Sequence, residues 1–144
     1  MEIIEITQVT DRLMQAFERL VPQLSSAAIP TREEVEDIVS SRASILLAAT
    51  DVENDDEIVG LLTLVVFRIP TGVRAWIEDV VVDQEQRGRG IGDALTRAAL
   101  ERAKAEGAKT VDLTSRPSRE AANRLYQRVG FVLRHTNLYR YNLE

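Results

Sequence analysis

A glycine-rich segment lies between an apolar run and an amphipathic helical pattern, and this junction restricts the chain to a mixed α/β fold. The run WIEDVVV (76–82) predicts a strand, and the segment that follows reads DQEQRGRGIGDA (83–94). Gly88, Gly90 and Gly92 allow the backbone to approach a ligand without interference from a Cβ atom. The helix that follows begins with unpaired N–H groups and the positive end of its dipole. The junction therefore predicts a phosphate-binding turn.

Two arginines, Arg87 and Arg89, add positive charge to this turn in a chain whose net charge is −5. Either could be an ordinary exposed side chain. Because both lie beside a glycine turn at a helix start, we expect at least one of them to contact the phosphate.

The composition is that of a single globular domain covering residues 1–144, with 44% apolar and 28% charged residues. The negative net charge argues against a nucleic-acid partner, and no apolar run approaches the roughly 20 residues that span a bilayer. Cysteine is absent, and the N-terminus MEIIEITQ lacks the basic start of a signal peptide. We therefore expect a cytoplasmic location and no metal site built on thiolates.

Periodicity predicts an antiparallel meander that leads into one parallel strand–helix–strand crossover, an α/β fold with a mixed sheet. Either Thr10 or Asp11 can cap the first helix, and Thr31 with Glu34 matches a capping box at the second. The predicted strands are residues 2–7, 44–49, 58–67, 74–82, 109–114, 131–134 and 138–143; the predicted helices are 11–24, 31–41, 91–107 and 118–129.

Three phosphate-binding motifs compete for the glycine turn. A P-loop requires Gly-Lys-Ser/Thr at the helix start, whereas Gly90 is followed here by Ile91, Gly92 and Asp93. A dinucleotide-binding G-x-G-x-x-G is broken at Asp93, and the chain has only one crossover unit. The third pattern, R-x-x-G-x-G, is matched by Arg87, Gly90 and Gly92.

With this pattern the chain resembles the GNAT superfamily of acetyl-coenzyme A-dependent N-acetyltransferases. The element order agrees over nearly the whole chain, and EAANRLYQRVGF (120–131) resembles the second cofactor motif of that family. The resemblance implies that the backbone from Arg87 to Gly92, Ile91 included, holds the pyrophosphate of coenzyme A. It also implies splayed central strands in which Val80, Val81 and Val82 pair with the pantetheine arm, with a β-bulge that aims one N–H at the thioester oxygen.

Glu78 and Asp79 interrupt an apolar strand, so at least one carboxylate takes a position where a valine would be expected. In the plain interpretation one is solvated at a strand end and the other caps a turn or pairs with an arginine. A buried acid is costly without a purpose, which favours a functional role for at least one of them. The resemblance implies that Glu78 is the general base, acting through water, and that Asp79 positions the amine.

Tyr126 matches the tyrosine of the family that returns a proton to the coenzyme A thiolate, although it could also simply pack beside Leu125 and Val129. Asn123 lies one turn earlier on the same helix. It is expected either to bind the pantetheine arm or to cap a turn. The only histidine, His135, lies outside both motifs and is expected on the surface.

The leading hypothesis is direct transfer of an acetyl group from acetyl-coenzyme A, without a metal, to a primary amine within a ternary complex. The acceptor is a small molecule, such as an amino sugar or polyamine, or a peptide. The alternative from another class is a non-catalytic acyl-coenzyme A sensor or adaptor on the same fold. A phosphate-binding regulator is a third alternative, and the resemblance leaves both a monomer and a homodimer open.

Overall fold

The computed structural model describes residues 1–144, which divide into two compact units, residues 1–114 and 115–144. The first unit holds β1 (Glu2–Glu5), α1 (Asp11–Leu24), α2 (Arg32–Ser40), β2 (Ser44–Asp51), β3 (Glu57–Ile69), β4 (Gly72–Val82), the short 3₁₀ helix η1 (Gln84–Gln86), α3 (Ile91–Ala105) and β5 (Thr110–Asp112). The second unit holds α4 (Glu120–Val129). None of the helices combines the length and the apolar character that crossing a membrane requires.

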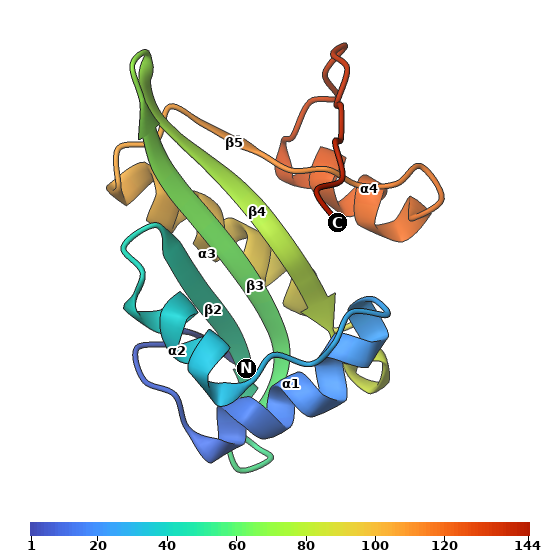
Figure 1. Cartoon of the computed structure of the whole chain (residues 1–144). Coiled ribbons are helices and arrows are strands. Elements are labelled where there is room, and N and C mark those ends of the chain that lie inside the picture. The colour runs from blue at the N-terminus through green and yellow to red at the C-terminus, as the bar shows by residue number, and fades with distance from the viewer. The chain divides into compact units, whose positions relative to one another are not determined.

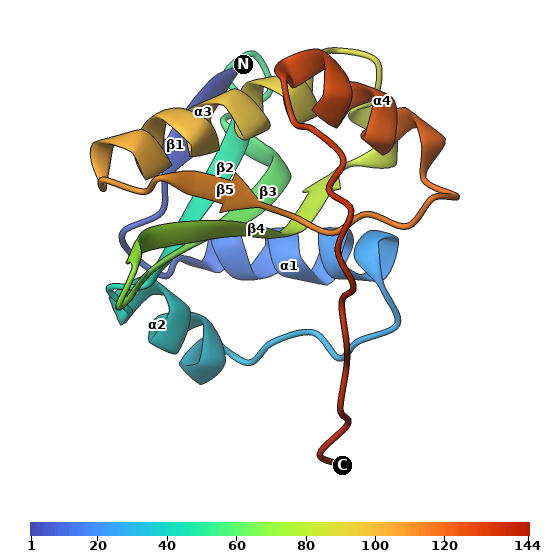
Figure 2. The same ribbon diagram turned by 90° about the horizontal axis from the view of Figure 1, so that it is seen from above.

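The first unit is built on a five-stranded sheet with the strand order β1-β2-β3-β4-β5. Figure 1 labels β2 to β5, and Figure 2 also labels β1. The pairs β1–β2, β2–β3 and β3–β4 are antiparallel, and β4 pairs with β5 in parallel across the α3 crossover. The predicted meander followed by one parallel crossover is therefore confirmed.

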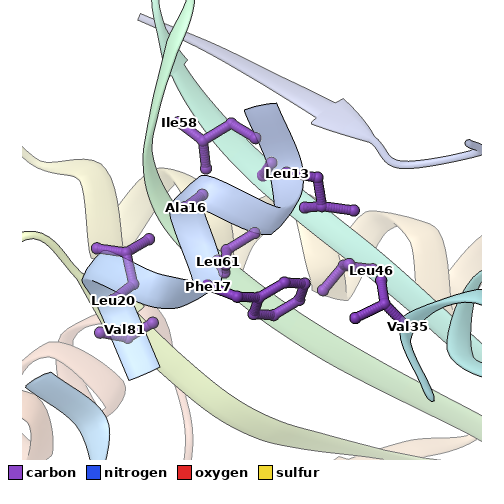
Figure 3. Packing of buried hydrophobic residues seen from close by; sticks show 10 residues of the cluster. Leu13, Ala16, Phe17, Leu20, Val35, Leu46, Ile58, Leu61 and Val81 are labelled. Atoms are coloured by element: carbon purple, nitrogen blue, oxygen red, sulfur yellow. The ribbon is translucent and has the colours of Figure 1, made fainter. Parts of the chain in front are cut away.

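Helices cover both faces of this sheet, with α1 and α2 on one face and α3 on the other (Figure 2). The apolar spacing that predicted α1 turns its buried side chains toward β2, β3 and β4. The resulting core cluster is drawn in Figure 3 and consists of Leu13, Ala16, Phe17, Leu20, Val35, Leu46, Ala48, Ile58, Leu61 and Val81.

Both predicted helix caps are present. Of the two candidates for α1, Thr10 is the cap, because its hydroxyl oxygen accepts the N–H of Leu13 at 3.1 Å. At α2 the Thr31 hydroxyl accepts the N–H of Glu34 at 3.2 Å, and the Glu34 carboxylate accepts the N–H of Thr31 at 3.0 Å. Each pairing satisfies N–H groups that a helix start leaves without intrahelical partners.

Two predicted strands are wrong. Residues 131–134 and 138–143 form neither strand nor helix, although their composition favours strands. A strand requires a partner to pair with, and β-propensity alone does not supply one. Apart from Phe131, the large apolar side chains of this segment are exposed, from Leu138 at 68% to Leu143 at 93%. The predicted strands 2–7 and 109–114 exist but are shorter, as β1 and β5.

Candidate functional site

The predicted phosphate-binding turn connects β4 to α3. Gly88 and Gly90 have positive φ angles of 82° and 75°, in the left-handed region that glycine favours. A Cβ atom added at either residue would meet nothing within 4 Å. The backbone conformation, rather than crowding, therefore accounts for glycine at these two positions.

The start of α3 is open to a ligand. Its N-cap is Gly90, which provides no side-chain hydrogen bond to the first turn. The N–H groups of that turn therefore lack a side-chain cap and favour an anion. Together with the open space at Gly88 and Gly90, they leave room for an anionic group, as the predicted phosphate-binding turn requires.

A third glycine, Gly60 of β3, sets the approach of α3 to the sheet. A Cβ atom at Gly60 would lie 3.1 Å from Ile91 Cγ2, 3.1 Å from Leu95 Cδ1 and 3.3 Å from the Val81 carbonyl oxygen. These distances are shorter than ordinary carbon contacts. Glycine at position 60 thus lets the first turn of α3 lie close against β3, beside the end of β4.

The two arginines of the turn differ in their surroundings. Arg89 lies 3.6 Å from the carboxylate of Asp51 (Nη1 to Oδ2) and donates a hydrogen bond to the side chain of Gln86. Arg87 is exposed and makes no ion pair or side-chain hydrogen bond within residues 1–114. Arg87 is therefore available to a phosphate group, whereas Arg89 is already engaged.

The expected β-bulge is present in β4. Glu78 is paired with Thr63 and Val81 with Leu61, so that Asp79 and Val80 together face Leu62 alone. Asp79 has a φ of 50°, which is uncommon for a residue other than glycine. The bulge thus lies at Asp79 and Val80, so it begins one residue before the stretch Val80–Val82 in which it was expected.

The parallel pairing of β4 is brief. It joins Arg74, Ala75 and Trp76 to Thr110, Val111 and Asp112, and it stops there. From Ile77 to Val82, β4 has no partner in β5, although it stays paired with β3. The splayed central strands implied by the resemblance therefore appear as an unpaired β4 edge that leads to the glycine turn.

Glu78 and Asp79 are both exposed. The argument that a buried acid implies a function therefore does not apply to either. Glu78 is paired with Thr63 of β3, and paired residues of neighbouring strands share a sheet face. Thr63 lies two residues from Leu61, a core residue on the face that α1 and α2 cover, so Glu78 lies on that face too. Trp76 is half-buried and lies on the same face two residues before Glu78.

Tyr126 lies in α4, in the second unit. Burial raises the pKa of its phenol above the usual tyrosine value, and the positive charge of Arg119 opposes the shift. The ring makes an edge-to-face contact with Phe131, with centroids 5.8 Å apart. The phenol therefore keeps its proton at neutral pH, as a proton donor must.

Asn123 lies in the same helix, and its side-chain NH₂ group is used locally. It donates to the carbonyl oxygens of Arg116 and Arg119, at 2.9 Å each. These bonds hold the loop before α4 and match the turn-capping alternative. His135 is exposed, as expected, but it lies outside any strand.

Two aspartates, Asp51 and Asp83, lie beside the turn, and the sequence gives no clear signal for either. Asp51 and Asp83 are the only charged residues of the chain that are buried, at 8% and 6% exposed. Asp51 belongs to the run DVENDDE (51–57), which reads as a solvated hairpin loop; residues 52–56 are exposed, but Asp51 is not. Asp83 directly follows the strand WIEDVVV, and this position was the only available signal. No group of three or more His, Asp or Glu side chains could hold a metal ion.

These features are those of mixed α/β proteins in which the start of a helix, beside an unpaired strand edge, offers its N–H groups to an anion. The family model of the GNAT acetyltransferases matches residues 7–131. The chain therefore belongs to the GNAT acetyltransferase family. Enzymes of this family use acetyl-coenzyme A as a cosubstrate and act on amine-bearing substrates.

Individual relatives agree with this assignment. N-alpha-acetyltransferase 30 of Schizosaccharomyces pombe is 40% identical over 73 residues, which cover 51% of this chain and 48% of that protein. The chain thus spans about half the length of this curated relative.

Solved structures share the fold. The structure of an Agrobacterium tumefaciens protein assigned to the acetyltransferases has a TM-score of 0.85 at 22% identity, covering 99% of this chain and 100% of that one. Glucosamine-6-phosphate N-acetyltransferase from Arabidopsis thaliana has a TM-score of 0.80 at 20% identity, covering 98% and 99%.

Proposed function

We propose that this protein transfers the acetyl group of acetyl-coenzyme A directly to a primary amine, within a ternary complex. The observation that carries the proposal is the glycine turn, which opens α3 at the end of a bulged strand with an unpaired edge. The absence of cysteine from the chain agrees with direct transfer, because an acyl-cysteine intermediate is not possible.

The cofactor end of the site consists of backbone groups and a guanidinium. The N–H groups from Arg87 to Gly92, those of Gly88, Gly90 and Ile91 among them, hold the pyrophosphate, and Arg87 adds a charged contact. Val80, Val81 and Val82 offer the backbone of the unpaired β4 edge to the amide groups of the pantetheine arm. The NH₂ group of Asn123 donates to carbonyl oxygens of the loop before α4, and its side-chain oxygen accepts a hydrogen bond from the same arm.

The reaction requires a neutral amine and a proton for the departing thiolate. Acetyl-coenzyme A, when bound, supplies the thioester carbonyl that the amine attacks. Glu78 takes the proton from the amine through a water molecule, and the neighbouring carboxylate of Asp79 positions the amine. Tyr126 donates the proton to the thiolate, because a tyrosine phenol is protonated at neutral pH and can act as the acid.

The amine is carried by a peptide or by a small molecule. The α-amino group of a peptide is our first candidate, because the relative at 40% identity is named an N-alpha-acetyltransferase. Amino sugars and polyamines form the second class, and the exposed carboxylates Glu78 and Asp79 suit a cationic amine in either class.

A thiol-release screen tests the proposal. The protein is incubated with acetyl-coenzyme A and, in turn, a peptide with a free N-terminus, an N-terminally blocked peptide with one lysine, an amino sugar and a polyamine. We expect free thiol to appear with at least one acceptor, and fastest with the free N-terminus. If acetyl-coenzyme A raised the melting temperature while no acceptor released thiol, the protein would instead be a non-catalytic sensor.

We further propose that residues 1–144 form one N-acetyltransferase domain, because the family match runs from residue 7 to residue 131, across the boundary between the two units. A cytoplasmic location and the choice between monomer and homodimer remain predictions from the sequence.

A further inference from the structure

The two ends of the phosphate-binding turn are each held by a buried aspartate. Asp83 lies where β4 passes into the turn, and Asp51 ends β2. A buried carboxylate is costly unless it is paired, so the partners of these two residues show what each one holds.

Asp83 fixes the first end of the turn to α1. Its Oδ2 atom accepts a hydrogen bond from Arg19 Nε at 3.2 Å, and its Oδ1 atom accepts the N–H of Glu85 at 3.2 Å. One turn further along α1, the side-chain oxygen of Gln23 accepts the N–H of Gln84 at 2.8 Å. The start of the turn is therefore attached to a helix of the core.

Asp51 holds the second end through Arg89. Its Oδ1 atom accepts the N–H of Glu53 at 3.2 Å, which fixes the carboxylate, and its Oδ2 atom lies 3.6 Å from Arg89 Nη1. Arg89 also donates to Gln86 within the turn. Its guanidinium thus links the turn to the hairpin between β2 and β3.

We propose that Asp51 is a positioning residue for coenzyme A, and that Arg89 stabilises the turn through its ion pair with Asp51 instead of binding phosphate. The Asp51–Arg89 pair holds the turn in its binding conformation before the ligand arrives, and Arg87 is the guanidinium that meets the phosphate. This inference rests on the proposed use of coenzyme A, and it assigns different tasks to the two arginines of the turn.

Removing the charge of Asp51 distinguishes two roles for Arg89: stabilising the turn, and binding the phosphate. If Arg89 were a phosphate ligand that Asp51 restrains, Asp51→Asn would release it and remove a negative charge near the anion, so coenzyme A would bind more tightly. If the pair preorganises the turn, the same change loosens it, and binding becomes weaker. The two arrangements therefore predict changes of opposite sign.

The experiment is a calorimetric titration of coenzyme A into the parent protein, Asp51→Asn, Arg89→Gln and the double variant. We expect each single variant to raise Kd roughly threefold to tenfold, and the double variant to be scarcely weaker than the singles, because both changes remove one link. The matched control is Glu53→Gln, which removes the same charge from an exposed side chain of the same hairpin. It should leave Kd unchanged.

Two further readouts separate positioning from general damage to the fold. The KM for acetyl-coenzyme A in Asp51→Asn should rise by the same factor as Kd, while kcat at saturation stays that of the parent. The second readout uses Arg89→Gln, whose parent side chain is half-exposed, so that the test does not depend on Asp51→Asn folding. The dependence of its Kd on salt should remain as steep as in the parent, whereas Arg87→Gln should make it shallower.

Tighter binding by Asp51→Asn would overturn the inference, as would a salt dependence in Arg89→Gln as shallow as in Arg87→Gln. In either case the parent still binds coenzyme A, so the proposed function stands. If the parent bound no coenzyme A, the proposed function and this inference would both be wrong.

Discussion

Glu78 is the residue on which the proposed chemistry depends most. It is exposed on β4 and makes no ion pair or side-chain hydrogen bond within residues 1–114, so its carboxylate is available to an amine or a water molecule. We expect Glu78→Gln to lower kcat roughly a hundredfold, because the amide cannot accept the proton. The Kd for coenzyme A should not change. Stopped-flow measurement of thiol release gives kcat, and Glu101→Gln on the exposed side of α3 is the control with the same charge change.

Tyr126 allows a direct test of the proton donor. Tyr126→Phe should lower kcat about a hundredfold, since the ring is kept but the proton is lost. Tyr141→Phe, at a tyrosine that is 87% exposed, should have no effect on kcat. Equal loss of activity in both variants would contradict the assigned role.

Burial also gives Tyr126 a predictable effect on stability at alkaline pH. Its pKa is raised in the folded protein, so the folded state holds the phenol proton more tightly than the unfolded chain does. That contribution to the free energy of unfolding is complete below the unfolded pKa of about 10 and is lost as the pH rises through the folded pKa. Above that pH, the free energy of unfolding measured in urea should therefore fall more steeply with pH in the parent than in Tyr126→Phe.

At the scale of the element, the bulge in β4 stores a local backbone strain at Asp79. A left-handed conformation costs an L-residue roughly 1–2 kcal/mol, and a β-branched side chain suits it least. We expect Asp79→Gly to leave the free energy of unfolding equal or slightly higher, and Asp79→Val to lower it by about 1 kcal/mol or more. Both variants should raise the KM for the amine. Urea unfolding and amine titrations measure the two effects, and a more stable Asp79→Val would show that the bulge is not strained.

The contact between β3 and α3 yields a second prediction at this scale. In Gly60→Ala the added methyl group would press on Ile91 and Leu95 at 3.1 Å, which moves the start of α3 away from the sheet. We expect a loss of about 1–3 kcal/mol in unfolding free energy, together with weaker binding of coenzyme A. Gly107→Ala is the control for a loss of stability alone, because its positive φ of 84° strains an alanine, whereas a Cβ there would meet nothing within 4 Å and would not move the start of α3. Unchanged coenzyme A binding in Gly60→Ala would contradict the role given to this contact.

Features set by neighbouring residues could be predicted from the sequence. The glycine turn, the Thr31–Glu34 capping box and the parallel crossover each depend on a short pattern, and each is present. The ion pair of Asp51 with Arg89 joins the end of β2 to the glycine turn, which lie far apart in the chain, and no local sequence pattern predicts it. The local sequence around Asp51 therefore predicts only a solvated loop.

The C-terminal segment shows the opposite error. Residues 131–134 and 138–143 have side chains that favour strands, yet the backbone forms none. Strand propensity describes how well a side chain fits a half-buried sheet surface, so it predicts a strand only where such a surface is provided. The bulge at Asp79 and Val80 was expected from the resemblance, but its exact residues depend on the register with β3.

At the scale of the whole molecule, the proposal of a single domain predicts that both units unfold together. The only tryptophan, Trp76, reports on residues 1–114. Because the chain has no cysteine, Ser118→Cys provides a unique labelling site in residues 115–144. We expect the tryptophan and the label to give the same urea midpoint. Two separate midpoints would show that the units are independent domains.

The central claim is that this chain moves an acetyl group from acetyl-coenzyme A to an amine nitrogen, and mass spectrometry of the acceptor tests it most directly. With isotopically labelled acetyl-coenzyme A and a peptide bearing a free N-terminus, the account predicts one labelled acetyl group on the α-nitrogen for each thiol released. The yield should fall sharply in Glu78→Gln and Tyr126→Phe. An acceptor panel that gains no label, although coenzyme A binds the protein, would contradict the account.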